Sequence, residues 1–147
     1  PRQVHRKPSG DIFIASLNLC LVSPSAVMLR RTLFHRVGGF DTGLPACEDY
    51  DLWLRITRDT PVALIPDACV VKYGGHADQL SRQHWGMDRF RVAAILRVLA
   101  EGELPPAYHT AAVRVLAEKC TILAHGARKR GREEEAQRYE TLATLFA

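Results

Sequence analysis

Four carboxylates, all between residues 41 and 51, are the side chains of this chain best placed to do chemistry. They are Asp41, Glu48, Asp49 and Asp51, and a bulky apolar run follows the last of them. Successive residues of a helix are turned by about 100 degrees, so the last three acids cannot share one helical face. Paired glycines before this stretch and a large apolar anchor after it can fix one carboxylate at the rim of a cleft.

A purely structural interpretation stands beside the functional one. Glu48 and Asp49 would then be acids at the start of a helix, where the positive end of the helix dipole favours them. Asp51 would be a surface partner for Arg55, four residues further along the same helix.

The elements expected to position these acids are short. Residues 11–22 are apolar and fit either a short helix or a buried strand, while residues 26–30 are typical of a strand. A short helix follows and ends at Gly38–Gly39. The next helix is expected from about Glu48 to Arg58, with Trp53 and Ile56 as its apolar anchors.

Beyond this helix the pattern first favours strands and then helices. Pro61 blocks continuation of the helix, and the runs "VALIP" and "ACVVKYGG" predict two short strands around a turn. From about residue 83 the periodicity is helical. Three amphipathic helices are expected there, with Leu116 and Ile122 among the residues that pack between them and a turn at Gly131.

Composition limits the broad class of the protein. The 147 residues are 47% hydrophobic and 24% charged, which fits a globular domain with a buried core. The net charge of +4 is spread along the chain and mixed with acids, so nucleic-acid binding is not expected. The four cysteines lack CxxC spacing, which indicates neither a zinc site nor a disulfide framework.

The string "SAVMLRRTLFHRVGGFDTGLPACEDYDLWLRI" carries a family resemblance. It resembles the C-terminal half of the family 2 nucleotide-sugar glycosyltransferases, which have the GT-A fold. In that family an apolar strand ends in paired basic residues, and a short helix, a Gly-Gly-Phe-Asp turn and a variable loop follow before Glu-Asp opens a helix. The resemblance extends more loosely from about Gly10 to His76, roughly half of the chain.

This resemblance implies a fold and a division of the chain. The expected fold class is α/β, a mixed α+β partial GT-A sheet followed by an α-helical C-terminal segment. Residues 1–10 would be a linker-like N-terminus, residues 11–80 the C-terminal part of a glycosyltransferase catalytic domain, and residues 81–147 a helical tail. Bacterial polysaccharide biosynthesis is the expected setting.

The resemblance also assigns roles to residues. Asp49 matches the general base that takes a proton from an acceptor hydroxyl in an inverting transfer. Asp41 resembles the turn aspartate that shapes the acceptor side. Glu48 would either support the base or cap the helix. His76 matches an additional ligand of the donor-bound metal or is a loop residue. Arg82 either contacts the donor pyrophosphate or begins a solvated helix.

The departures from the family pattern set further expectations. No Asp-x-Asp motif of a donor site precedes residue 38. The chain is therefore expected to be a fragment that is inactive alone, with Mn²⁺ or Mg²⁺ bound mostly by the missing half of the full-length enzyme. The expected partners are a nucleotide-sugar donor and a saccharide or lipid-linked acceptor.

Two further expectations concern location and an alternative role. The protein would be cytoplasmic, with the inner face of a membrane as a surface it contacts peripherally. The alternative function is a non-catalytic binding or assembly module that keeps a glycosyltransferase-like scaffold.

Overall fold

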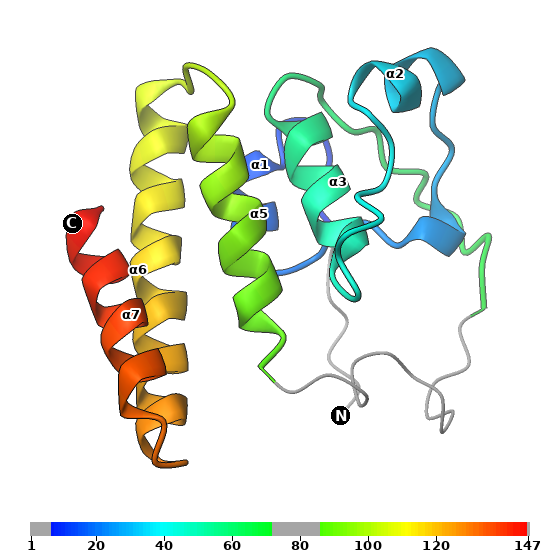
Figure 1. The fold of residues 1–147 in the computed structure, drawn as a ribbon. Helices are drawn as coiled ribbons and strands as arrows, with labels where there is room; N and C mark the ends of the chain where they lie inside the picture. Colours follow the sequence, from blue (N-terminus) through cyan, green and yellow to red (C-terminus); the bar gives the residue numbers. More distant parts are fainter. Residues whose placement is uncertain (1–6, 72–85, 147) are drawn as a thin grey trace.

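The computed structural model describes residues 7–71 and 86–146, which form six α-helices and one short 3-10 helix. In chain order these are α1 (Phe13–Asn18), η1 (Pro24–Ala26), α2 (Arg31–Arg36), α3 (Glu48–Thr57), α5 (Asp88–Ala100), α6 (Pro106–Arg128) and α7 (Glu133–Leu145). Helices α7, α6, α5 and α3 follow one another side by side, and α1 packs against both α6 and α3 (Figure 1).

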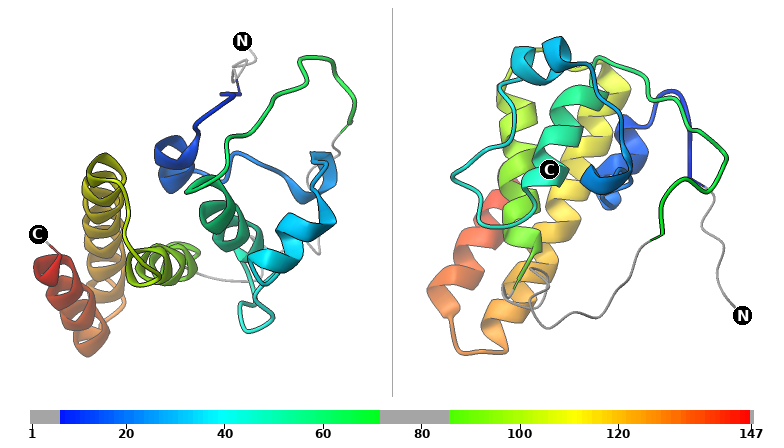
Figure 2. Two further views of the ribbon diagram at one scale, coloured as in Figure 1. Left: turned by 90° about the horizontal axis from the view of Figure 1, so that it is seen from above. Right: turned by 90° about the vertical axis from the view of Figure 1, so that its right-hand side faces the viewer.

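The main apolar core joins the N-terminal helices to the C-terminal ones. It contains buried side chains of α1, α3, α5 and α6, among them Phe13, Tyr50, Ile95 and Leu116. Figure 2 shows the same arrangement from above, with α3 lying between α5 and the segment that carries α2. Helix α3 is therefore held from two sides.

A second, smaller core lies on the other side of α3. Leu52, Trp53 and Ile56 are buried there against apolar residues of α2 and of the chain before it. The prediction that Trp53 and Ile56 anchor this helix is confirmed, since their side chains are only 4% and 3% exposed. The predicted helix from about residue 48 to 58 is confirmed as α3.

Glycines end the short helix α2, as predicted. The chain leaves α2 through Gly38 and Gly39, which adopt the left-handed φ values of 82° and 68°. Their amide groups donate to the carbonyl oxygens of His35 and Phe34, which the helix end would otherwise leave unpaired. A Cβ atom at position 39 would lie 3.1 Å from the Phe34 ring, so the close approach also favours glycine.

The C-terminal helices agree with their sequence signals, with one exception. Helix α6 has Pro106 in its first turn, and Gly131, with φ 70°, ends the turn that leads toward α7. Arg128 at the end of α6 pairs with Glu133 and Glu140 of α7. The prediction that Ile122 packs between helices is wrong, because its side chain is 60% exposed.

The predicted α/β fold class is wrong. Residues 7–71 and 86–146 contain no strand and no sheet; they contain only an isolated antiparallel bridge between Gly10 and Val62. A partial GT-A sheet is therefore not present in this part of the chain. Of the two alternatives for residues 11–22, a short helix is the one observed, as α1.

Within the described residues, the predicted strands gain no pairing beyond the single bridge between Gly10 and Val62. Residues 27–30 and 63–71 have no regular secondary structure, and Met28, Ile65 and Val71 are 96%, 65% and 75% exposed. Strand preference reflects the fit of β-branched and apolar side chains to a half-buried pleated surface. The described residues provide no such surface for these segments.

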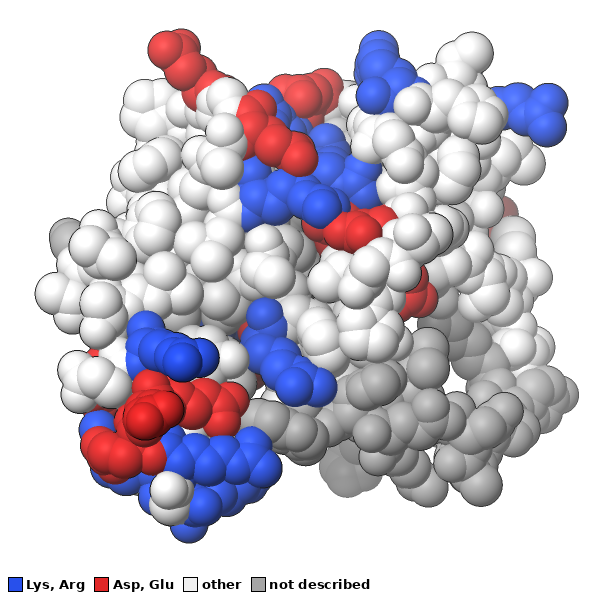
Figure 3. Space-filling model, in the orientation of Figure 1, with Lys and Arg blue, Asp and Glu red and all other residues white. Residues whose placement is uncertain are grey.

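Charged residues of both signs gather in two places on one face of the molecule. Figure 3 shows one group over α3 and α5 and another at the end where α6 meets α7. None of the helices in residues 7–71 and 86–146 has both the length and the hydrophobicity that a membrane-spanning segment requires.

Candidate functional site

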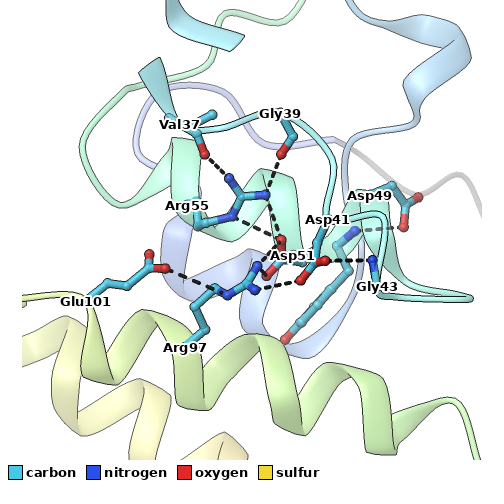
Figure 4. A network of polar contacts seen from close by, with 10 residues as sticks. Val37, Gly39, Asp41, Gly43, Asp49, Asp51, Arg55, Arg97 and Glu101 are labelled. Carbon is cyan, nitrogen blue, oxygen red and sulfur yellow. Dashed lines mark hydrogen bonds and ion pairs between the residues drawn. The ribbon is translucent and has the colours of Figure 1, made fainter. Parts of the chain in front are cut away.

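Helix α3 presents its first-turn acids to different sides. The helix starts after Cys47, which has a left-handed φ of 61°, and carries Glu48, Asp49 and Asp51 in its first turn. Two residues along a helix correspond to a rotation of about 200 degrees. Asp49 and Asp51 therefore lie on opposite sides of α3, and Figure 4 shows them pointing apart.

Asp51 lies between two arginines and is buried. Its carboxylate accepts hydrogen bonds from Nε and Nη2 of Arg55, at 3.0 and 2.7 Å, and from Nη1 of Arg97, at 3.2 Å to each oxygen. The predicted pair with Arg55 is confirmed. The prediction that Asp51 is a surface residue is wrong, because its side chain is only 1% exposed.

Arg55 also holds the chain that follows α2. Its guanidinium donates to the carbonyl oxygen of Val37 and, at 2.7 Å, to that of Gly39 (Figure 4). One side chain of α3 thus satisfies two backbone carbonyls of the preceding turn. Buried carbonyl groups need such partners, so Arg55 fixes the path of this turn against α3.

Asp41 uses both of its carboxylate oxygens inside the protein. Oδ1 accepts from the backbone amide of Gly43 at 2.8 Å, and Oδ2 accepts from Nη2 of Arg97 at 2.6 Å. The Gly43 amide, together with Arg97, holds the pKa of Asp41 below its usual value. Asp41 therefore stabilises its own turn through Gly43 and connects that turn to α5 through Arg97.

Asp49 lies outside this network. Its side chain is half-buried, with Oδ1 accepting from the Tyr50 amide at 2.7 Å and Oδ2 accepting from the Cys20 thiol at 3.5 Å. Burial, together with the nearby charge of Asp49, raises the pKa of Cys20 to about 12. The thiol is thus protonated at neutral pH and can donate, but a thiol is a weak donor.

The position of Asp49 is set by its rigid neighbours. Tyr50, next to it, is buried and donates its phenolic hydrogen to the Leu17 carbonyl oxygen of α1 at 2.6 Å. On the following turn Trp53 is buried in the smaller core. A carboxylate on such a helix has a fixed direction, which orientation-dependent catalysis requires.

Glu48, His76 and Arg82 are the other residues that the sequence predicts for this site. Glu48 precedes Asp49 and is half-buried at the start of α3. His76 and Arg82 lie outside the described residues. Within residues 7–71 and 86–146 no group of three His, Cys, Asp or Glu side chains could hold a metal ion, so the expected divalent cation is not assigned to any of them.

Two residues at this site were not identified from the sequence. Arg97 belongs to a region predicted to form helices that pack together, and Cys20 belongs to the apolar segment at residues 11–22. Neither pattern predicts a contact with the acidic residues. The one local signal for Arg97 is a cation inside the apolar run "AAILRVLA" of α5. Its partners Asp51 and Asp41 are 46 and 56 residues away, so no short motif reveals the contacts.

Comparison with known proteins adds a distant relation. The chain is 29% identical over 84 residues to an uncharacterized glycosyltransferase of Rickettsia felis, and 30% identical over 84 residues to one of Rickettsia conorii. Each similarity covers 52% of this chain and 14% of the relative. The chain is distantly similar to glycosyltransferases.

The relation is partial. Because the similarity spans 14% of each relative, it concerns a small part of those proteins. No family model matches the chain, and no solved structure matches it. Membership of family 2 stays a prediction.

Proposed function

We propose that this chain is the acceptor-side and catalytic-base part of an inverting glycosyltransferase of the family 2 type. The proposal is supported by the partial similarity to glycosyltransferases, and above all by the placement of Asp49. Of the two aspartates on α3, Asp51 is enclosed by arginines, whereas Asp49 is half-buried and outside that network.

In the proposed reaction Asp49 acts as general base. Its Oδ2 accepts the proton of an acceptor hydroxyl, and the hydroxyl oxygen forms a bond to the anomeric carbon of the donor sugar. The bond from that carbon to the diphosphate breaks on the opposite face, and the nucleoside diphosphate leaves with the electron pair. The weak contact with the Cys20 thiol at 3.5 Å can be exchanged for a stronger one with a hydroxyl.

The donor site is proposed to lie outside residues 7–71 and 86–146. A divalent cation for the donor phosphates is part of the proposal, and His76, which lies outside the described residues, stays a predicted ligand. The donor is proposed to be a nucleotide sugar and the acceptor a saccharide or lipid-linked saccharide. Contact with a membrane surface stays a prediction.

The test compares variants of the full-length parent protein. Wild type, Asp49→Asn and Glu118→Gln would be assayed for nucleotide release with a panel of nucleotide sugars, acceptors, and Mn²⁺ or Mg²⁺. Asp49→Asn keeps the shape of the side chain and removes the base, so turnover should fall by about a hundredfold or more, since general-base catalysis typically contributes about a hundredfold to ten-thousandfold. Glu118→Gln is the control, because Glu118 forms an exposed ion pair on α6 away from the proposed site, and it should retain wild-type activity.

Other outcomes would change the assignment. Normal turnover by folded Asp49→Asn would mean that Asp49 is only an acid at a helix start. If no donor reacts even with wild type, a non-catalytic binding or assembly module becomes the better account of the chain.

A further inference from the structure

Arg97 is the one described side chain that binds both aspartates of the network from a separate helix. It lies on α5 and donates to Asp41 at 2.6 Å and to Asp51 at 3.2 Å. A third carboxylate, that of Glu101, lies 3.7 Å from its Nε atom. A single guanidinium therefore joins α5 to the turn before α3 and to α3 itself (Figure 4).

The contacts of Arg97 complement those of Arg55. Arg55 ties the carbonyl oxygens of Val37 and Gly39 to Asp51 from within α3. Arg97 ties Asp41, at the far end of the same turn, to the same Asp51 from α5. Contacts from α3 hold Val37 and Gly39, and a contact from α5 holds Asp41, so the turn is fixed at both of its ends.

We infer that Arg97 is a positioning residue for the acceptor side of the proposed site: through Asp41 and Asp51 it holds the turn at residues 38–43 against the first turn of α3. This inference rests on the proposed function. It also gives the C-terminal helices a role, because α5 brings to the proposed site a side chain that α3 and its turn do not contain. Arg97 does not touch the reacting atoms in this scheme.

Arg97 is not expected to be essential for the stability of the fold. The Arg97 side chain is 37% exposed, and its removal leaves the Asp51–Arg55 pair and both apolar cores in place. The fold should therefore persist without it. Its guanidinium has a planar fork that can engage two carboxylates at once, whereas lysine offers a single point charge.

The first experiment uses the full-length parent protein with Arg97→Gln, Arg97→Lys and the control Arg114→Gln. Arg114 forms an exposed ion pair with Glu118 on α6 and takes no part in the network. With equal folded fractions, Arg97→Gln should lower kcat/KM for the acceptor by about tenfold to a hundredfold with little change in the donor KM, because small misplacements at a reaction site are costly. Arg97→Lys should recover part of this kcat/KM, and Arg114→Gln should match wild type.

The second experiment measures the local structure of the turn at residues 38–43 and does not depend on enzyme activity. The Gly43 amide, bonded to Asp41, should exchange with solvent faster in Arg97→Gln than in wild type. A carbon NMR titration should show the pKa of the Asp41 carboxyl rising in the same variant.

The outcomes distinguish the positioning role of Arg97 from the proposed function of the protein. A kcat/KM for the acceptor within twofold of wild type for Arg97→Gln, or unchanged Gly43 exchange, would overturn the positioning role while leaving Asp49 as the base. A wild type that turns over no donor would overturn the proposed function, and the positioning role in catalysis with it.

Discussion

Asp49 and Asp51, two residues apart on α3, point to opposite sides of the helix: Asp49 toward the Cys20 thiol and Asp51 into the space between Arg55 and Arg97. Asp51 therefore links α3 to its neighbours through the two arginines, whereas Asp49 takes no part in these ion pairs. Burial separates the two, because Asp51 is enclosed on all sides and Asp49 is half-buried.

Replacing Asp51 by alanine should be strongly destabilising. The change leaves two arginines without their shared buried partner, and breaking a buried ion pair in this way costs about 3–5 kcal/mol. Urea unfolding followed by circular dichroism would measure the loss. The matched control is Glu118→Ala, which removes an exposed pair with Arg114 and should cost about 0.5 kcal/mol. Equal losses for the two variants would contradict the burial of Asp51.

The paired glycines should differ in their tolerance of alanine. Both have positive φ values, so each substitution should cost about 1–2 kcal/mol through backbone strain. Gly39→Ala should cost about 1–3 kcal/mol more, because the new Cβ meets the Phe34 ring at 3.1 Å, whereas position 38 is open. Thermal and urea unfolding of both variants would test the difference. If adding Phe34→Leu to Gly39→Ala restores nothing, the steric cause is wrong.

The pKa of the Cys20 thiol should fall when the charge of Asp49 is removed. Burial is the largest cause of its raised pKa, and the negative charge of Asp49 adds to it by opposing the thiolate. Asp49→Asn should therefore shift the alkylation of Cys20 to lower pH. The internal control is Cys120, whose pKa is raised to about 11 by burial alone and should not respond. Mass spectrometry after alkylation across a pH series would follow both thiols, and a parallel shift of both would contradict the contact.

The contribution of Asp41 to stability should depend on pH. Its pKa is lowered in the folded protein, first by the Gly43 amide and then by Arg97. Its stabilising effect is then fully present above the unfolded pKa, about 3.9, and is lost as the pH falls through the lower folded value. The difference in unfolding free energy between wild type and Asp41→Asn should be constant near pH 7 and shrink below about pH 4. A difference that grows in acid would give the opposite sign and refute the assignment.

Local sequence patterns predicted the helices well. Helix α3 follows from apolar residues at helical spacing, and Trp53 and Ile56 are buried as expected. Helix α2 follows from the paired glycines that end it. These features are fixed by residues within a few positions of each other, which is why the sequence alone suffices for them.

Other features depend on contacts that the sequence does not display. The strand predictions failed because residues such as Val70 and Val71 have no partner segment within the described residues. The pairing of Asp51 with Arg55 was predictable from their spacing, but the burial of the pair depends on α5 packing against α3. Arg97 was missed for the same reason, since its partners lie far away in the chain.

The contact between α6 and α7 has a consequence for how the molecule opens. Ala124, Ala127 and Ala136 are buried together there, and Ala136 is the one buried residue in α7 among those described. The larger apolar side chains of α7 that pack against the core, Tyr139 and Leu142, are only partly buried, whereas α3 is buried on both sides. We expect the amide hydrogens of α7 to exchange through local unfolding well before those of α3. The C-terminal helix can then unfold and refold locally while α3, which carries Asp49, stays folded.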